Sequence, residues 1–166
     1  GGKGLIQMVT EKSKIPVIKH YSGICHVYLD QLGDISKGVR IALDSKCLMP
    51  EVCNAMETLL VSQQLSDEIP AIVRAFKQCG VTVRGCEKTL DIAPGIEAAK
   101  EQDWQTEYLD NIISIRVVAN VDEAIEHIST YGSHHTDTIV TDNKKNADKF
   151  TQEVDSAVVL VNASTM

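Results

Sequence analysis

The chain has 166 residues, of which 16 are basic and 23 acidic, so its formal net charge is −7 with histidine neutral. This acidic balance argues against nonspecific nucleic-acid binding, for which a basic surface is expected. With 43% hydrophobic and 23% charged residues, the chain can bury a core, which argues against a disordered protein. No apolar run approaches the roughly 20 residues of a membrane helix, and no signal peptide opens the sequence.

The five cysteines predict a reducing compartment. Their number is odd and their spacing indicates no disulfide framework. The cysteines and histidines show neither a CxxC nor an HxxxH spacing, so we expect no metal site. A cytoplasmic location follows from these features. Because the sequence does not begin with Met, we expect it to be a segment of a longer protein.

Strands and helices are predicted to alternate through the first half of the chain. A short helix over residues 5–9 comes first. Asp34 is expected to cap a helix, and Ser66 or Asp67 the next one, which Gly80 ends. Short runs rich in β-branched and other apolar residues predict strands at 15–18, 24–29, 58–61 and 81–83.

The last third of the chain has the clearest pattern. Residues 86–109 are irregular and predict a loop with helical fragments. Asn120 is expected to cap a helix that ends at Gly132, and Asp142 or Asn143 to cap another. Strands are predicted at 112–118, 138–140 and 157–161. This alternation predicts an α/β fold with a mostly parallel sheet and flanking helices.

Cys53 lies between a predicted helix and a predicted strand, in the segment PEVCNAMET that spans residues 50–58. A thiol in such a loop, close to backbone N–H groups, can have a lowered pKa and act as a thiolate nucleophile. The alternative is a small buried hydrophobic residue without reactivity. Loop position alone does not decide between the two.

The same segment resembles the catalytic-cysteine segment of the γ-glutamyl phosphate reductases, members of the aldehyde dehydrogenase superfamily. Three further stretches support the resemblance, which runs in order along essentially the whole chain: 15–18 with 23–30, 124–128 with 131–137, and 154–157 with 161–165. The chain is also similar to the reductase half of the fused pyrroline-5-carboxylate synthases. The sequence does not separate these two possibilities.

The resemblance implies an aldehyde dehydrogenase-like catalytic domain at residues 34–166, preceded at 1–33 by the end of an NADPH-binding domain. The implied reaction is the NADPH-dependent reduction of γ-glutamyl phosphate to glutamate 5-semialdehyde, in proline biosynthesis. The resemblance also implies that phosphate is released as a thioester forms on Cys53. A homo-oligomer is implied for the full-length protein, with glutamate 5-kinase as pathway partner or fused domain. A fused eukaryotic synthase would imply a mitochondrial location.

The resemblance also suggests residues that contact the cofactor. Glu107 aligns with the superfamily glutamate that holds the nicotinamide ribose, and the alternative is a solvated loop carboxylate. Gly1 and Gly2 look like the end of the glycine turn beside the cofactor phosphates, where glycine lets the backbone approach an anion. Two glycines at a chain start are also compatible with a cloning remnant.

Four residues are expected to bind the substrate: Asn54, Asn162, Ser164 and Thr165. The last three follow the final predicted strand, and their amide and hydroxyl groups suit an amino-acid or phosphate moiety. Ordinary turn chemistry is the alternative. His134 and His135 are part of a segment that resembles a family motif, but no catalytic role follows from the sequence.

Two other functions compete with the reductase. One is an acylating aldehyde dehydrogenase that uses coenzyme A. The other is a non-catalytic binding or regulatory domain on the same scaffold, which the reactivity of Cys53 would distinguish.

Overall fold

The computed structural model describes residues 3–18, 22–32 and 34–166. Within these ranges the strands form one seven-stranded, wholly parallel sheet in the order β4-β3-β5-β2-β1-β6-β7. The strands are β1 (Cys25–Leu29), β2 (Met56–Ser62), β3 (Thr82–Gly85), β4 (Glu97–Ala98), β5 (Ile112–Val118), β6 (Thr136–Val140) and β7 (Val158–Val161). The predicted α/β class is therefore confirmed.

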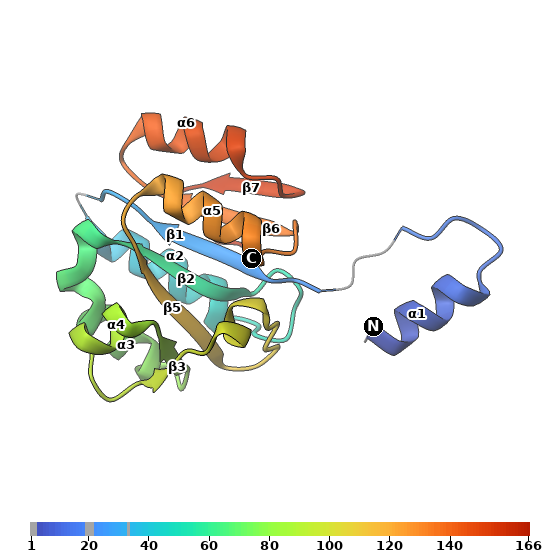
Figure 1. Cartoon of the computed structure of the whole chain (residues 1–166), viewed down its shortest axis with the longest axis horizontal. Coiled ribbons are helices and arrows are strands. Elements are labelled where there is room, and N and C mark those ends of the chain that lie inside the picture. The colour runs from blue at the N-terminus through green and yellow to red at the C-terminus, as the bar shows by residue number, and fades with distance from the viewer. Residues whose placement is uncertain (1–2, 19–21, 33) are drawn as a thin grey trace.

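Helices cover both faces of this sheet (Figure 1). The α-helices that do so are α2 (Ile35–Cys47), α3 (Ile69–Gln78), α4 (Glu87–Ile92), α5 (Val121–Tyr131) and α6 (Lys144–Glu153). The described residues also form α1 (Lys3–Lys12), which does not cover the sheet, and the 3₁₀ helices η1 (Gln63–Glu68) and η2 (Glu101–Gln105). Because side chains alternate along a strand, Val27 and Leu29 pack in the core under α2 and α3, whereas Tyr28 packs in the core under α5 and α6.

Three helix caps form as local chemistry predicts. The side chain of Asp34 accepts a hydrogen bond from Ser36 N at the start of α2. Asn120 does the same for the N–H groups of the first turn of α5. At α6 the cap is Asn143 rather than Asp142. Each cap satisfies backbone donors that the first turn of a helix leaves without a partner.

Helix α3 differs from the prediction at its start. Neither Ser66 nor Asp67 caps it; both belong to η1, and the Ser66 hydroxyl donates to Gln63 O. The cap position is Glu68, without a side-chain cap, and Pro70 in the first turn presets the helical φ. The predicted end is confirmed. Gly80 has a φ of 76°, and Val81 N donates to Phe76 O, the hydrogen bond of a glycine-ended helix.

The prediction of a strand at 15–18 was wrong. These residues have no regular secondary structure, and the side chains of Ile15 and Ile18 are exposed. An apolar run forms a strand only where a neighbouring strand pairs with it. Helix α1 lies apart from the sheet (Figure 1), whereas β1 lies within the sheet, between β2 and β6. A domain boundary after residue 33, as the family resemblance implies, would separate β1 from its neighbouring strands β2 and β6, with which it pairs.

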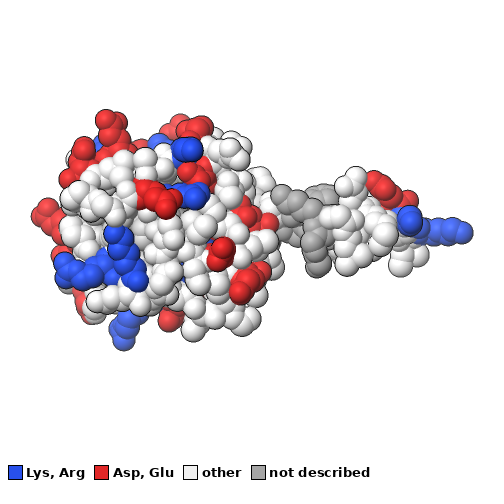
Figure 2. Space-filling view, turned by 90° about the horizontal axis from the view of Figure 1, so that it is seen from below, with Lys and Arg blue, Asp and Glu red and all other residues white. Residues whose placement is uncertain are grey.

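Figure 2 shows acidic side chains scattered over one face of the molecule, with basic side chains in small groups among them. This distribution agrees with the net charge of −7. None of the helices in the described residues is long and apolar enough to cross a membrane.

Candidate active site

Cys53 lies in the turn that connects α2 to β2, at the amino ends of the central strands. Cys25 pairs with Met56 at the start of β1 and β2, and His26 pairs with Asp137 near the start of β6. The loops that precede these three strands therefore converge. Parallel sheets more often bind ligands at the carboxyl ends of their strands, so this candidate site uses the opposite edge.

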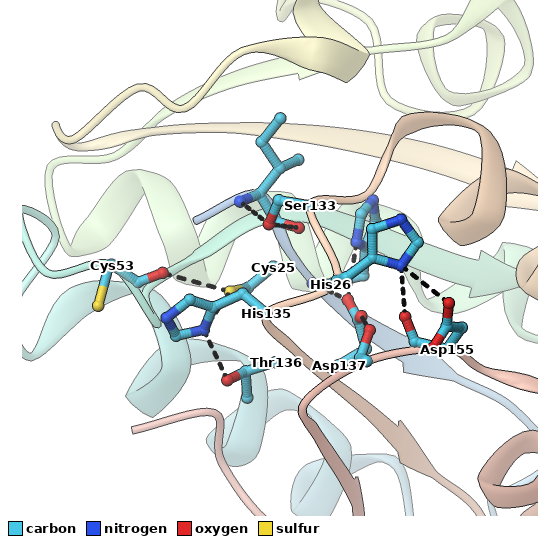
Figure 3. A network of polar contacts seen from close by, with 11 residues as sticks. Cys25, His26, Cys53, Ser133, His135, Thr136, Asp137 and Asp155 are labelled. Carbon is cyan, nitrogen blue, oxygen red and sulfur yellow. Dashed lines mark hydrogen bonds and ion pairs between the residues drawn. The ribbon is translucent and has the colours of Figure 1, made fainter. Parts of the chain in front are cut away.

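The turn around Cys53 packs directly on the segment before β1. A Cβ atom on Gly23 would lie 1.7 Å from Cys53 O, so only glycine fits this approach. The Cys25 thiol donates to the same carbonyl oxygen at 3.4 Å. Cys53 itself is exposed, and its sulfur points away from Cys25 (Figure 3). The Cys53 side chain is thus accessible, whereas the backbone of its turn is held in place by its contacts with Gly23 and Cys25.

Glu107 reaches the same segment from a distant part of the chain. Its Oε1 accepts a hydrogen bond from Gly23 N at 2.7 Å, and the residue is half-buried. Because Gly23 touches the Cys53 carbonyl, the structure brings Glu107 close to Cys53. The carboxylate is held in place by this bond, which distinguishes it from a freely solvated loop residue.

A buried ion pair connects the Cys53 segment to the loop of Glu107. Lys46 Nζ lies 2.7 Å from Glu57 Oε2, and both side chains are almost fully buried. Burial raises the pKa of Glu57 to about 7, although the Lys46 ammonium opposes this rise. The other oxygen of Glu57 accepts from Leu109 N at 3.3 Å. Glu57 thereby ties the strand that follows Cys53 to the chain two residues beyond Glu107.

The two adjacent histidines have different surroundings. His135 Nδ1 lies 3.8 Å from Cys25 Sγ and 2.8 Å from Thr136 Oγ1, beside the Cys53 turn (Figure 3). His134 is exposed, has a φ of 59°, and lies 2.6 Å from Asp155 O through Nδ1. His134 therefore belongs to a surface turn, whereas His135 borders the candidate site.

Three of the four expected substrate-binding residues gather beside Cys53. Asn54 Nδ2 donates to Thr165 O at 2.7 Å. Ser164 Oγ lies 3.1 Å from Ser45 Oγ, which accepts from Thr165 N. The buried hydroxyl of Thr165 has no hydrogen-bond partner among the described residues.

Asn162 is not part of this group. Its amide bonds both the N–H and the carbonyl of Thr141, each at 3.0 Å, and its φ is 57°. Thr141 follows β6 at its carboxyl end, opposite the edge where Cys53 lies. The Asn162 amide therefore stabilises a turn, in a left-handed conformation that asparagine tolerates. Gly1 and Gly2 lie outside the described residues.

Sequence reasoning missed the buried polar groups behind the site. His26 Nδ1 lies 2.9 Å from Asp137 Oδ1, and Ser156 donates to Asp137 Oδ2 at 2.5 Å. The His26 and His127 rings meet edge to face. Burial lowers the pKa of His127 to about 2, with smaller effects from His26 and Arg116. These residues come together only in the tertiary structure. The one signal in the sequence was a glycine just before a strand, Gly23, with a cysteine, Cys25, at the first residue of that strand.

Comparisons with known proteins indicate the family that this chain resembles. No family model matches the chain. A γ-glutamyl phosphate reductase from a Nitratiruptor species is 52% identical over 99% of this chain and 40% of its own length. The crystal structure of a γ-glutamyl phosphate reductase from Thermotoga maritima is 48% identical with a TM-score of 0.95, over 99% of this chain and 40% of that one.

A more distant structure shares the fold. The acetylating aldehyde dehydrogenase from Geobacillus thermoglucosidasius is 21% identical with a TM-score of 0.76, over 99% of this chain and 45% of that one. The resemblance inferred from the sequence is therefore confirmed, and so is the aldehyde dehydrogenase-like fold. The chain spans about 40% of the length of the curated relatives it matches.

Proposed function

We propose that this chain is the part of a γ-glutamyl phosphate reductase that carries the reactive cysteine. The observation that carries this proposal is an exposed Cys53 on a backbone-anchored turn, in a chain 52% identical to such a reductase over 99% of its length. The substrate is γ-glutamyl phosphate and the product is glutamate 5-semialdehyde, in proline biosynthesis. A glutamate 5-kinase would supply the acyl phosphate.

In the first half-reaction the Cys53 thiolate attacks the carbonyl carbon of the acyl phosphate. A C–S bond forms, the bond from carbon to the phosphate oxygen breaks, and phosphate leaves with the electron pair. The oxyanion of the tetrahedral intermediate needs a hydrogen-bond donor, and the backbone N–H of Cys53 is the nearest one in sequence. The product is a thioester on Cys53.

In the second half-reaction this thioester is reduced and released. NADPH, when bound, supplies the hydride for this reduction. The part of Cys53 is to hold the acyl carbon and then to leave: the C–S bond breaks, its electron pair returns to sulfur, and the aldehyde departs. Glu107 suits the cofactor ribose, because it is a half-buried carboxylate already oriented by Gly23 N at 2.7 Å and carboxylates accept hydrogen bonds from hydroxyls.

We place the amino-acid end of the substrate against Asn54, Ser164 and Thr165. These residues share contacts beside Cys53, and the Thr165 hydroxyl is a buried group without a partner among the described residues. Asn162 would act indirectly, by holding the turn that precedes Ser164.

The test uses the full-length enzyme that contains this chain, assayed in reverse with glutamate 5-semialdehyde and NADP⁺. NADPH should form when phosphate is added and not when phosphate is replaced by coenzyme A. Cys53→Ala should abolish the reaction, whereas Cys79→Ala, which removes another exposed thiol, should not. Dependence on coenzyme A would favour the acylating aldehyde dehydrogenase, and no turnover with either acceptor would favour a non-catalytic domain.

A further inference from the structure

Cys25 is the most deeply buried of the five thiols and lies under the proposed nucleophile. Its exposed fraction is 0%, and its sulfur lies 3.4 Å from the carbonyl oxygen of Cys53. Figure 3 shows the Cys53 sulfur turned away from it, so the two thiols do not compete for one substrate. The contact joins Cys25, the first residue of β1, to the turn that carries Cys53.

The Cys25 thiol is a hydrogen-bond donor in this contact, because a carbonyl oxygen can only accept. Burial, reinforced by the nearby Asp137 carboxylate, raises the pKa of Cys25 well above its usual range. The sulfur therefore keeps its proton at neutral pH. An S–H group is a weak hydrogen-bond donor. Here it is buried, and a hydrogen bond in the protein interior is electrostatically stronger than one in water.

We propose, on the premise of the function proposed above, that Cys25 is a positioning residue for Cys53. Its S–H anchors the carbonyl of the peptide that joins Cys53 to Asn54, and Gly23 packs on the same oxygen from the side. A trans peptide is planar, so fixing the carbonyl fixes the backbone on which the Cys53 side chain is mounted. The Asn54 N–H then points to the opposite side, away from Cys25.

Asn54 anchors the other end of this peptide. Its side chain donates to Thr165 O at 2.7 Å, and Ala55 N donates to Val52 O at 3.0 Å within the turn. The nucleophile is thus exposed at its sulfur but held through its backbone from two directions. Such anchoring of the reacting group contributes to rate without a contact to substrate.

The test compares Cys25→Ala, which removes the donor, with Cys25→Ser, which keeps one. The matched control is Cys86→Ala, a half-buried thiol that follows β3 at the opposite edge of the sheet. In the full-length enzyme, Cys25→Ala should lower kcat by about ten- to a hundredfold, because a misplaced reacting group costs that much. KM for the semialdehyde should stay unchanged. Cys25→Ser should recover most of the rate, and Cys86→Ala should retain it.

A second measurement does not depend on activity. Amide hydrogen exchange across residues 52–55 of this chain should speed up in Cys25→Ala and stay at the wild-type rate in Cys25→Ser. If the alanine variant does not fold, Cys25→Val, which fills the space without a donor, replaces it.

Wild-type kcat in Cys25→Ala, or an equal loss in the alanine and serine variants, would overturn the inference. If the wild-type enzyme itself makes no NADPH, the proposed function fails. The exchange rates then decide alone whether Cys25 anchors the turn: unchanged exchange in Cys25→Ala would overturn the inference, and faster exchange would support it.

Discussion

The five thiols of the chain differ in exposure and in protonation. Cys53 and Cys79 are exposed, whereas Cys25 is buried and Cys47 and Cys86 are half-buried. Burial, with a smaller effect from Cys79, raises the pKa of Cys47 to about 12, and burial also raises the pKa of Cys25. The thiolate is the reactive form of cysteine, and Cys79 is exposed like Cys53. Cys79 is therefore the thiol that we expect to compete with Cys53 for an alkylating reagent.

We expect limited iodoacetamide treatment of the native chain to label Cys53 first. Its thiol is exposed, whereas Cys25 is buried and Cys47 is half-buried, and burial raises the pKa of both of those thiols. Peptide mapping by mass spectrometry measures the order. Labelling of Cys53 after the buried thiols, or a clear lead for Cys79, would contradict its assignment as nucleophile.

Glu107 is the second residue whose role can be tested alone. In the full-length enzyme, Glu107→Gln should raise the cofactor KM or lower kcat by an amount equal to about 1.5–3 kcal/mol, the range for hydrogen bonds to charged groups. The amide oxygen can still accept from Gly23 N, so the fold should persist. Steady-state kinetics with Glu126→Gln, a change on an exposed position of α5, provide the control. Unchanged kinetics in Glu107→Gln would reduce the residue to a structural contact.

At the scale of elements, the short segment before β1 joins three loops. Gly23 N binds Glu107, Gly23 packs on the Cys53 turn, and Ile24 N donates to Ser133 Oγ at 2.8 Å. Even the shortest of these contacts along the chain, between Gly23 and Cys53, joins segments that have β1 and α2 between them. The segment is therefore the common support of the candidate site.

Gly23→Ala should disturb this support. The new Cβ would lie 1.7 Å from Cys53 O, and only a backbone shift can relieve the overlap. We expect a loss of about 1–3 kcal/mol in the free energy of unfolding, the cost of overpacking, measured by urea denaturation. Gly4→Ala in α1, where nothing lies within 4 Å of the new Cβ, should cause no loss. Equal stability of both variants would show that the Cys53 turn moves freely.

The packing of α5 on β1 predicts an acid sensitivity through His127. Its pKa falls to about 2 in the folded chain, so between about pH 2 and about pH 6.5 the unfolded chain binds the extra proton. This contribution to stability is complete above the upper value and is lost as the pH falls. Urea midpoints at about pH 5 and about pH 7 should differ more in the wild type than in His127→Gln. An equal pH dependence in both proteins would contradict a buried neutral His127.

At the scale of the whole molecule, the site belongs to a unit that spans about 40% of its curated relatives. We expect most of the dinucleotide-binding domain of such a reductase, of which residues 1–33 would be only the end, to lie outside this chain. Holding the nicotinamide against the Cys53 thioester is a matter of positioning, which contributes about 7–11 kcal/mol in favourable cases. The catalytic group and the element that orients its partner would thus be in different parts of the enzyme.

The 166-residue chain alone should therefore fold but show no NADPH-dependent reductase activity. It should still release phosphate from an acyl phosphate, since acylation of Cys53 needs only a thiolate and an oxyanion donor. The assay is the reverse reaction with semialdehyde, phosphate and NADP⁺, compared with a Cys53→Ala control. NADPH formation above that control would mean that the chain carries its own cofactor site.

Features that depend on neighbours along the chain could be predicted from the amino-acid sequence. The caps at Asp34 and Asn120, the end of α3 at Gly80 and the strand at 112–118 are set by residues within a turn or by a local pattern. The motif around Cys53 likewise carried the resemblance, because it is continuous.

Where these features meet in space could not be predicted from the sequence and became clear from the three-dimensional fold. Glu107 accepts a hydrogen bond from Gly23, which is 84 positions away in sequence. The Cys25 thiol donates to the carbonyl of Cys53, 28 positions away. Asn162 lies at the opposite edge of the sheet from Cys53, although it is only two residues from Ser164. The same holds for residues 15–18, which have strand-forming side chains but no strand to pair with. Such contacts depend on the order and register of parallel strands, which are set by packing between distant segments and not by the local preference of any residue.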